Sequence, residues 1–374
     1  MRLLHVHSGN IFGGVERMLQ TLAPATAGRT PLTSSFALCF DGQISEVLVA
    51  AGATVYKLGT VRTSRLDQVW HARRALRKLL ETGGWDVVCV HSSWSQAIFG
   101  STIVQSGIPL VRWLHAPEPG PWWLDAGARA ARPALVLCNS YYTHDAAKTS
   151  LGTLPAAVHY PPIRIPDSGQ SDREAVRAEI GVTAETPVIA IAARMEPWKG
   201  HRLLLDGLRR LTDIPWQAWI IGGAQRPSER AYFDELVALA GQTDLRDRVQ
   251  FLGQRTDVPR LLGAADLYCQ PNEGPEPFGL SFVEALSAGL PVVTTRSGAA
   301  PEIVDRNCGV LVEPNSPAAL ADALRPLLTD HTARRAMSVA ARARAAEFCD
   351  LSRSLPALKR HLNRAIAASA TVHA

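Results

Sequence analysis

The residues best suited to chemistry lie in one short stretch, 272–284, in which two glutamates have seven residues between them. An apolar, strand-like run precedes this stretch and a helical pattern of apolar residues follows it, so the sequence predicts a strand, a turn and a helix. The backbone N–H groups of residues 278–280 would then lie at the helix start, where free donors and the helix dipole favour a diphosphate. Glu276 and Glu284 would flank that position and could both face a ligand.

A purely structural interpretation of the second glutamate stays open. Ser281 and Glu284 match the S-x-x-E pattern of a capping box. In that motif the serine hydroxyl and the glutamate carboxylate accept hydrogen bonds from backbone N–H groups at a helix start. The residues alone favour neither this role nor ligand binding.

A second stretch, 192–200, supplies two cations after another strand of buried character. Arg194 and Lys199 would both reach the loop region at the carboxyl end of that strand, where they could neutralise a departing diphosphate. The alternative is that both are solvated surface charges, which are common on loops.

A third stretch, 9–16, lies between the first predicted strand and the first predicted helix. Its adjacent glycines, Gly13 and Gly14, would let the backbone approach a ligand closely. The stretch lacks the G-x-G-x-x-G fingerprint, so a nicotinamide cofactor receives little support.

Composition limits the classes of protein that could carry these stretches. The chain has 374 residues, of which 47% are hydrophobic and 20% charged, without repeats or blocks of one sign, so we expect a globular protein of two or three domains. No apolar run reaches the roughly 18 residues that span a bilayer. A net charge of +5 is too small to indicate nucleic acid. The six cysteines form no CxxC pair, which predicts buried free thiols, no metal site and a cytoplasmic protein.

Strand-like and helical patterns alternate along almost the whole chain, which predicts an α/β protein with parallel sheets wound by helices. The first series of strands covers residues 3–8, 35–40, 54–58, 87–91, 110–114, 134–138 and 156–160. A proline-rich segment then breaks the pattern, and a second series covers 188–192, 216–221, 249–252, 267–270, 291–294 and 310–312. We therefore expect two Rossmann-like, doubly wound domains, 1–163 and 170–350, facing across a cleft. A final helix, 351–374, would pack back across the domain junction.

Together these stretches resemble glycosyltransferase family 4, the retaining, nucleotide-sugar-dependent enzymes with the GT-B fold. The E-x7-E signature of that family is matched by Glu276 and Glu284, and its R-x4-K-G motif by Arg194, Lys199 and Gly200. The family's amino-terminal G-G-x-E form corresponds to residues 13–16. Residues 298–302 resemble its G-G-x-P-E motif, although Ala299 replaces the second glycine.

The resemblance implies a role for each matched residue of the second domain. Glu276 would contact the transferred sugar, Glu284 the ribose, and Arg194 with Lys199 the diphosphate. The remaining donor-binding residues are those of the phosphate cradle and the nucleobase segment, together with the amino-terminal glycine pair: Phe278, Gly279, Leu280, Gln254, Arg255, Gly13 and Gly14. No metal is implied, since the two cations would supply the positive charge.

The first domain would bind the acceptor. His115 follows a predicted strand and matches the family's histidine near the reacting sugar; a structural hydrogen-bonding role is the alternative. His91 could line the acceptor side. Trp122 and Trp123, in a proline-rich loop, could form a stacking wall for an acceptor sugar or pin the loop to the core.

The resulting hypothesis is a retaining hexosyltransferase that moves a sugar from a nucleotide-diphosphate sugar, UDP-linked rather than GDP-linked, to a hydroxyl acceptor. The acceptor would be a glycan, a lipid-linked glycan or a small natural product, in polysaccharide or glycoconjugate biosynthesis. Two alternatives stay open: a nucleotide-sugar epimerase or hydrolase on the same fold, and a non-catalytic partner that binds sugar nucleotides.

A cluster of basic residues raises one further possibility for the first domain. Arg62, Arg65, Arg73, Arg74, Arg77 and Lys78 lie on or next to a predicted helix that carries Trp70. This surface could meet anionic lipid headgroups at the inner face of the membrane, because each basic group near such a surface contributes about 1 kcal/mol. The alternative is an ordinary solvated helix face.

Overall fold

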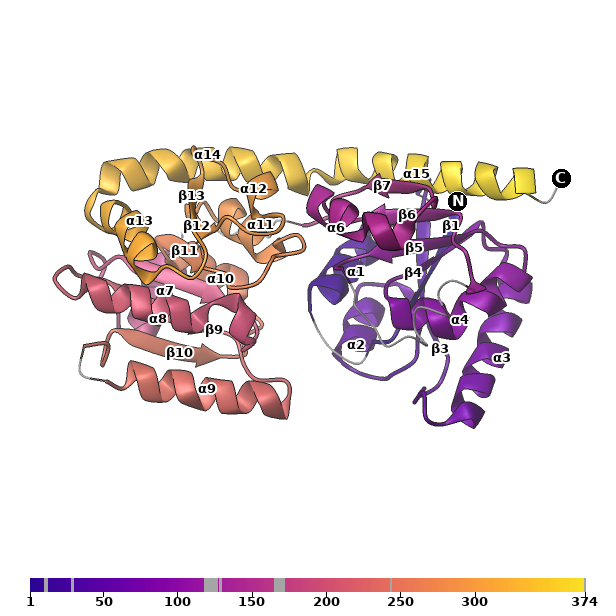
Figure 1. The fold of residues 1–374 in the computed structure, drawn as a ribbon, viewed down its shortest axis with the longest axis horizontal. Coiled ribbons are helices and arrows are strands. Elements are labelled where there is room, and N and C mark those ends of the chain that lie inside the picture. The colour runs from indigo at the N-terminus through magenta and orange to yellow at the C-terminus, as the bar shows by residue number, and fades with distance from the viewer. Residues whose placement is uncertain are drawn as a thin grey trace. The chain divides into compact units, whose positions relative to one another are not determined.

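The computed structural model describes residues 1–9, 13–27, 30–117, 127, 130–164, 172–242 and 244–372 (Figure 1). The chain divides into two compact units. The first comprises Met1–Arg164 together with Asp350–Ala374, and the second comprises Ile165–Cys349.

Among the described residues, the first unit contains a seven-stranded parallel sheet with the order β3-β2-β1-β4-β5-β6-β7. Its strands are β1 (Arg2–His7), β2 (Thr33–Leu38), β3 (Thr54–Lys57), β4 (Val87–Val90), β5 (Leu110–Leu114), β6 (Leu135–Cys138) and β7 (Ala156–Val158). Its helices are α1 (Gly14–Ala25), α2 (Gln43–Ala50), α3 (Leu66–Gly83), α4 (Ser93–Gln105), α6 (Tyr141–Leu151) and α15 (Leu351–Val372).

Helices cover both faces of this sheet because alternate residues of each strand point to opposite sides. One face packs against α1, α2 and α15, and α15 inserts Leu358, Leu362 and Ala365 into this layer. The other face packs against α3 and α4, which also contact each other (Figure 1). The carboxyl-terminal helix therefore belongs to the core of the first unit.

The second unit contains, within its described residues, a six-stranded parallel sheet with the order β10-β9-β8-β11-β12-β13. Its strands are β8 (Val188–Ala192), β9 (Gln217–Ile221), β10 (Val249–Gly253), β11 (Leu267–Gln270), β12 (Val292–Thr295) and β13 (Gly309–Val312). Its α-helices are α7 (Arg173–Ile180), α8 (His201–Leu208), α9 (Pro227–Ala240), α10 (Val258–Ala264), α11 (Leu280–Ser287), α12 (Ala300–Ile303), α13 (Pro317–Thr329) and α14 (His331–Cys349).

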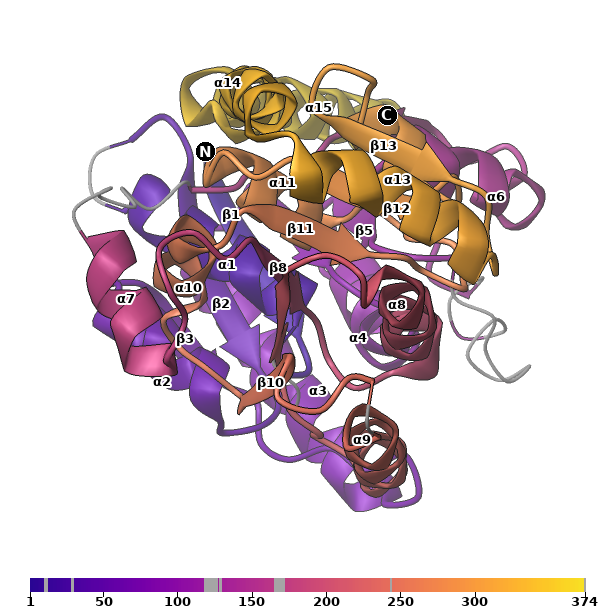
Figure 2. The same ribbon diagram turned by 90° about the vertical axis from the view of Figure 1, so that its left-hand side faces the viewer.

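The core of the second unit also lies between the sheet and its helices. Leucines of α8 and α13 pack together on one face, where the two helices lie side by side (Figure 2). On the chain's return path, α14 packs against α11, the helix that begins beside the candidate site. In both sheets the direction in which successive strands are added reverses once, between β1 and β4 in the first sheet and between β8 and β11 in the second. Ligands of such sheets bind at this point, beyond the carboxyl ends of the strands.

The structure confirms the two doubly wound parallel sheets, and every predicted strand is present with ends shifted by no more than two residues. The six cysteines are unpaired and buried, also as expected. One detail of the predicted helix that carries Trp70 differs. Leu66 and Trp70 match its apolar pattern but are 79% and 56% exposed, because α3 buries the face that carries Val69, Ala72, Leu76 and Leu80 instead. In the described part of the chain, no helix has the length and apolar character needed to cross a bilayer.

Candidate functional site

The turn after β11 leads directly into the start of α11, as the sequence predicts. Gly279 caps the helix with φ +99°, a left-handed conformation that favours glycine. A side chain here would also bring its Cβ to 2.4 Å from the ring of Phe282. The chain therefore needs glycine at this position to bring the N–H groups of Leu280 and its neighbours to the carboxyl end of the sheet.

Glu276 is the centre of a polar cluster in this turn. Its carboxylate is buried, with 8% of the side chain exposed, and Oε2 lies 2.9 Å from Nζ of Lys199. The same oxygen accepts hydrogen bonds from Nδ2 of Asn272 at 2.9 Å and from Nε2 of Gln270 at 3.3 Å. A cation and two amides thus hold the carboxylate in one place, as a preorganised site requires.

The backbone of Glu276 is fixed by the loop that follows β12. Gly298 forms a bridge with Glu276, and the N–H of Ala299 donates to the Glu276 carbonyl at 2.7 Å. Gly298 has φ +62°, and a Cβ added there would lie 2.3 Å from that carbonyl oxygen. The first glycine of the predicted G-G-x-P-E resemblance is therefore required by close packing. The second position tolerates Ala299, whose role is carried by its N–H.

The two predicted phosphate-binding cations have different surroundings. Lys199 lies over the ring of Trp198 at 3.8 Å and pairs with Glu276. Arg194 instead pairs with Glu229, a buried residue of α9, and lies 3.3 Å from Glu196. Both side chains are therefore held by carboxylates and are less than one quarter exposed, which contradicts the alternative of freely solvated surface charges.

The capping-box interpretation of Glu284 is wrong. The helix cap is Gly279, so Ser281 lies inside α11, and its hydroxyl donates to Oε1 of Gln270 at 3.1 Å. Glu284 lies one turn further along the helix and is half-buried. The serine of the S-x-x-E pattern thus supports the Gln270 amide of the Glu276 cluster and caps no helix.

The nucleobase segment lies after β10. Gln254 is exposed, and a Cβ on Gly223 would lie 3.3 Å from its side chain, so the loops after β9 and β10 are adjacent. Arg255 makes a bidentate ion pair with Asp257, with both nitrogen–oxygen distances at 2.7 Å. The guanidinium is thereby occupied locally, which fits a segment that would contact a base through its backbone.

The glycine pair of the first unit lies at the start of α1. The N–H of Gly13 donates to Oε2 of Glu16 at 2.8 Å, and Oε1 of the same carboxylate lies 2.6 Å from Nε2 of His7. Gly13 has φ −155°, an extended conformation that any residue can adopt. The G-G-x-E form therefore builds a buried carboxylate–imidazole pair at the carboxyl end of β1, with Gly14 as the first residue of the helix.

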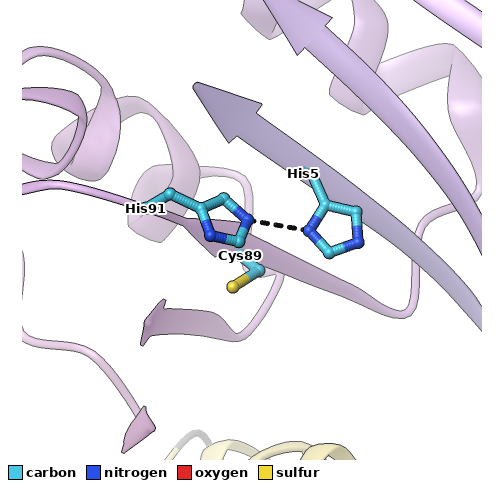
Figure 3. A group of neighbouring side chains, drawn as sticks. All are labelled: His5, Cys89 and His91. Atoms are coloured by element: carbon cyan, nitrogen blue, oxygen red, sulfur yellow. Dashed lines mark hydrogen bonds between the residues drawn. The ribbon is translucent and has the colours of Figure 1, made fainter. Parts of the chain in front are cut away.

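His91 and His115 are in direct contact at the carboxyl ends of β4 and β5. Nδ1 of His91 lies 3.0 Å from Nε2 of His115. On the other side of the same ring, Nε2 of His91 lies 2.8 Å from Nδ1 of His5, as Figure 3 shows. The carbonyl of His115 accepts from Nδ2 of Asn139 at 2.7 Å. Burial and the neighbouring imidazoles lower the pKa of His5 and that of His115 to about 3, and they hold the pKa of His91 well below its usual range.

The sequence prediction missed several residues of the site. Gln270 and Asn272 hold Glu276, and the hydroxyl of Tyr268 donates to Oε1 of Gln270 at 2.8 Å. Polar side chains at the end of an otherwise apolar strand are a signal that could have identified Gln270. Of the predicted residues, Trp122 and Trp123 lie outside the described part of the chain.

Buried neutral imidazoles predict acid sensitivity of the fold. His5, His115, His159 and His201 each have a folded-state pKa of about 3, lowered by burial, against about 6.5 when unfolded. The unfolded chain therefore binds more protons between these values, so stability is complete above pH 6.5 and is lost as pH falls. Each group costs up to roughly 1.4 kcal/mol per pH unit below 6.5. We expect the urea concentration at the unfolding midpoint to decrease when the pH is lowered from 7.5 to about 5.5. An unchanged midpoint would contradict the burial of these imidazoles.

The fold defines a class of protein. The two Rossmann-like parallel-sheet units have the GT-B fold of glycosyltransferases. Sequence comparison identifies the family. Residues 12–164 match the model of "Glycosyltransferase Family 4" and residues 172–344 that of "Glycosyl transferases group 1". The chain belongs to glycosyltransferase family 4 and is a glycosyltransferase.

Several curated proteins and solved structures are similar to this chain. A GDP-mannose-dependent monoacylated α-(1-6)-phosphatidylinositol monomannoside mannosyltransferase of Corynebacterium glutamicum is 33% identical over 66% of this chain and 68% of its own length. A D-inositol 3-phosphate glycosyltransferase of Corynebacterium diphtheriae is 34% identical, but the match covers only 48% of this chain and 43% of that enzyme. Anabaena HepE, solved with UDP and glucose, has a TM-score of 0.84 and 26% identity over 97% of this chain and 99% of its own.

These relatives confirm the coarser expectations of a transferase that acts with a nucleotide-sugar donor in glycoconjugate biosynthesis.

Proposed function

We propose that the second unit binds the nucleotide-sugar donor at the Glu276 cluster. Glu276 contacts the transferred sugar, and Lys199 with Arg194 neutralises the diphosphate. The N–H groups of residues 278–280 complete the phosphate cradle at the start of α11. Glu284 contacts the ribose, and the segment with Gln254 and Arg255 holds the base.

One observation carries this proposal: Lys199 and Glu276 lie 2.9 Å apart at the carboxyl end of β11. The amino end of α11 follows in the same turn, so a negative ligand meets a lysine and a helix start together, while a carboxylate stands ready for sugar hydroxyls. In a retaining transfer, the bond between the anomeric carbon and the phosphate oxygen breaks. The acceptor oxygen attacks from the same face, and its proton passes to the leaving phosphate. No metal is required, because the two cations offset the charge that develops on the diphosphate.

The donor is UDP-linked in this proposal. The support is HepE, whose structures contain UDP, UDP with glucose or UDP-glucose and which aligns over nearly the whole chain. We expect UDP at about 100 times its Kd to stabilise the protein by about 2.7 kcal/mol in a thermal-shift assay. GDP, ADP and their sugar derivatives serve as comparisons. A shift with GDP-mannose alone would reverse the base preference, in line with the GDP-mannose-dependent relative.

The first unit binds the acceptor in this proposal. His115 hydrogen-bonds a sugar hydroxyl or orients the acceptor, and His91 supports it at 3.0 Å. Trp122 and Trp123 stay predicted acceptor contacts, and Gly13 with Gly14 stays a predicted donor contact made from this unit. The hydroxyl acceptor is a glycan, a lipid-linked glycan or a small natural product.

A lipid-linked acceptor would agree with the exposed face of α3, through which we propose peripheral contact with an anionic membrane. Leu66 and Trp70 are one helical turn apart and largely exposed, and the Arg74 guanidinium lies 5.5 Å from the Trp70 ring. An exposed tryptophan beside basic residues suits the interface of an anionic bilayer.

We expect the protein to sediment with liposomes that contain anionic phospholipid at low salt, and the double variant Leu66→Ser/Trp70→Ser to lose at least half of this binding. Val237→Ser, which changes an exposed apolar residue of the second unit, is the matched control. Equal sedimentation of all three proteins, or none by the wild type, would exclude this membrane contact.

A further inference from the structure

A row of polar side chains crosses four neighbouring strands of the first sheet on one face. Phe36 pairs with His5, and His5 pairs with Cys89, in the strand register. Ser34 and His91 each lie two residues from these partners, so they face the same side of the sheet. His115 likewise follows Trp113 by two residues. The row Ser34, His5, His91, His115 therefore runs diagonally from within the sheet to the carboxyl end of β5.

The members of this row are joined by consecutive hydrogen bonds. Oγ of Ser34 lies 3.3 Å from Nε2 of His5, and the two bonds of His91, at 2.8 and 3.0 Å, continue the row to His115. The rings also stack on their neighbours: Phe36 lies 5.1 Å from His5 between ring centroids, and Trp113 lies 5.9 Å from His91. His5 and His91 are buried. The hydrogen-bonded row thus packs against aromatic rings. One ring nitrogen of His115, Nδ1, takes no part in the hydrogen bonds of the row.

The chemistry of imidazole restricts the tautomers that the three rings of this row can adopt. A neutral ring has one N–H donor and one acceptor nitrogen. If His91 donates from Nδ1 to His115, its Nε2 must accept from Nδ1 of His5, so all three rings carry the proton on Nδ1. If the direction is reversed, all three carry it on Nε2. Any mixture would place two lone pairs or two hydrogens against each other within 3.0 Å.

We propose that His5 and His91 are positioning residues for His115: the row of hydrogen bonds holds the three rings in one common tautomer, so that the hydrogen-bonding role of His115 Nδ1 toward the sugar is coupled to His5 and His91. This inference deepens the proposed function, because it rests on His115 meeting the substrate. Ser34 completes the row, because its hydroxyl can either donate to or accept from Nε2 of His5 and so fits either direction of hydrogen-bond donation.

A metal site is the competing interpretation of part of this row. His5, Cys89 and His91 offer ligand atoms within 4.8 Å of one another. However, the imidazole nitrogens of His5 and His91 meet directly at 2.8 Å, and the sulfur of Cys89 lies off the line between them (Figure 3). An ion bound at about 2.0 Å from each nitrogen would separate them further. The observed contact therefore favours a proton between the rings.

The test reads the tautomer of each ring directly. Long-range ¹H–¹⁵N NMR spectra of the full chain labelled with ¹⁵N-histidine are expected to show His5, His91 and His115 as neutral rings of one tautomer at pH 7.5. Assignment comes from single substitutions. Mixed tautomers, a charged ring at this pH, or ¹⁵N shifts that move when Zn²⁺ is added to the wild type would overturn the proposal.

Variants of the buried end then test the coupling. His5→Phe keeps a ring against Phe36, but this ring cannot form a hydrogen bond. We therefore expect the ¹⁵N shifts of His115 to change, although two hydrogen bonds and the His91 ring separate position 5 from His115. His5→Asn retains a polar group near the Nδ1 position and should restore the pattern in part. His361→Phe is the control: it alters an imidazole that packs against His159 and does not belong to the hydrogen-bonded row. It should leave the ¹⁵N shifts of His115 unchanged. Unchanged His115 shifts in a folded His5→Phe protein would overturn the coupling.

Kinetics separate this inference from the proposed function. With a working donor and acceptor, His5→Phe is expected to lower kcat roughly 10-fold or more, because His115 loses the partner that orients its ring through His91, while donor KM changes less than about twofold. His5→Asn should recover part of kcat. Normal turnover in a folded His5→Phe protein would overturn the positioning role. If the wild type transfers no sugar and binds no nucleotide, the proposed function fails. The NMR spectra still decide in that case whether the three imidazoles form the hydrogen-bonded row.

Discussion

Replacing Lys199 by alanine is expected to lower kcat at least ~100-fold, the usual loss when a preorganised charge partner is removed from an active site. The Nζ atom offsets the charge of the leaving diphosphate, and it also fixes the Glu276 carboxylate at 2.9 Å. Arg194→Ala should cause a loss of similar size, because it removes the second cation and leaves the buried Glu229 without its charged partner. Steady-state and single-turnover kinetics with saturating donor would measure both.

The matched control for these variants is Arg202→Ala. Arg202 lies three residues beyond Lys199, but its side chain is about half exposed and pairs with Glu235 on the surface, so it should keep normal turnover. Lys199→Arg keeps the charge and should retain more activity than alanine. Near-normal kcat in both Lys199→Ala and Arg194→Ala would refute their assigned roles.

The Gly298→Ala substitution is expected to have the second large effect. The new methyl group would meet the Glu276 carbonyl at 2.3 Å, and alanine is disfavoured at φ +62°. The loop after β12 and the Glu276 turn must therefore separate. Because a displacement of about 1 Å at a reacting centre can cost ~100-fold in rate, we expect a loss of that order in kcat together with a lower melting temperature.

A neighbouring substitution separates the backbone clash from a general effect on this loop. Ala299→Gly restores the second glycine of the family motif and keeps the N–H that donates to Glu276 at 2.7 Å. We expect nearly normal kcat and at most a small loss of stability from the added backbone freedom. If Gly298→Ala were as active as Ala299→Gly, the close approach at Glu276 would not be needed for catalysis.

The prediction of the fold from sequence succeeded because its signals are local. Each strand of the two sheets is a short apolar run bounded by polar or glycine-rich turns, and buried parallel strands need little else. The run 267–270 and the helical pattern after Gly279 illustrate this, since both elements lie where the pattern places them. The exposure of Trp70 was not accessible in the same way, because periodicity alone does not say which of two adjacent apolar stripes faces the sheet.

The candidate site was predictable to the extent that its residues are close in the sequence. Glu276, Gly279 and Glu284 belong to one turn and one helix, so their proximity follows from local geometry. Lys199 lies 77 positions from Glu276, and its pairing became evident only with the strand order that places β8 beside β11. The capping-box interpretation of Ser281 failed for a related reason, because the hydroxyl found a tertiary partner, Gln270, that the local pattern does not contain.

The sequence by itself determined the alternation of strands and helices, the turn chemistry and the residue types that could bind a nucleotide sugar. Only the tertiary structure decided which of these side chains touch: the pairing of Lys199 with Glu276, the close approach that Gly298 permits, and the diagonal row from Ser34 to His115. The physical reason is range. Backbone conformation and hydrophobic periodicity act over a few residues, whereas hydrogen bonds and ion pairs depend on strand order and register, which bring distant residues together only in the folded chain.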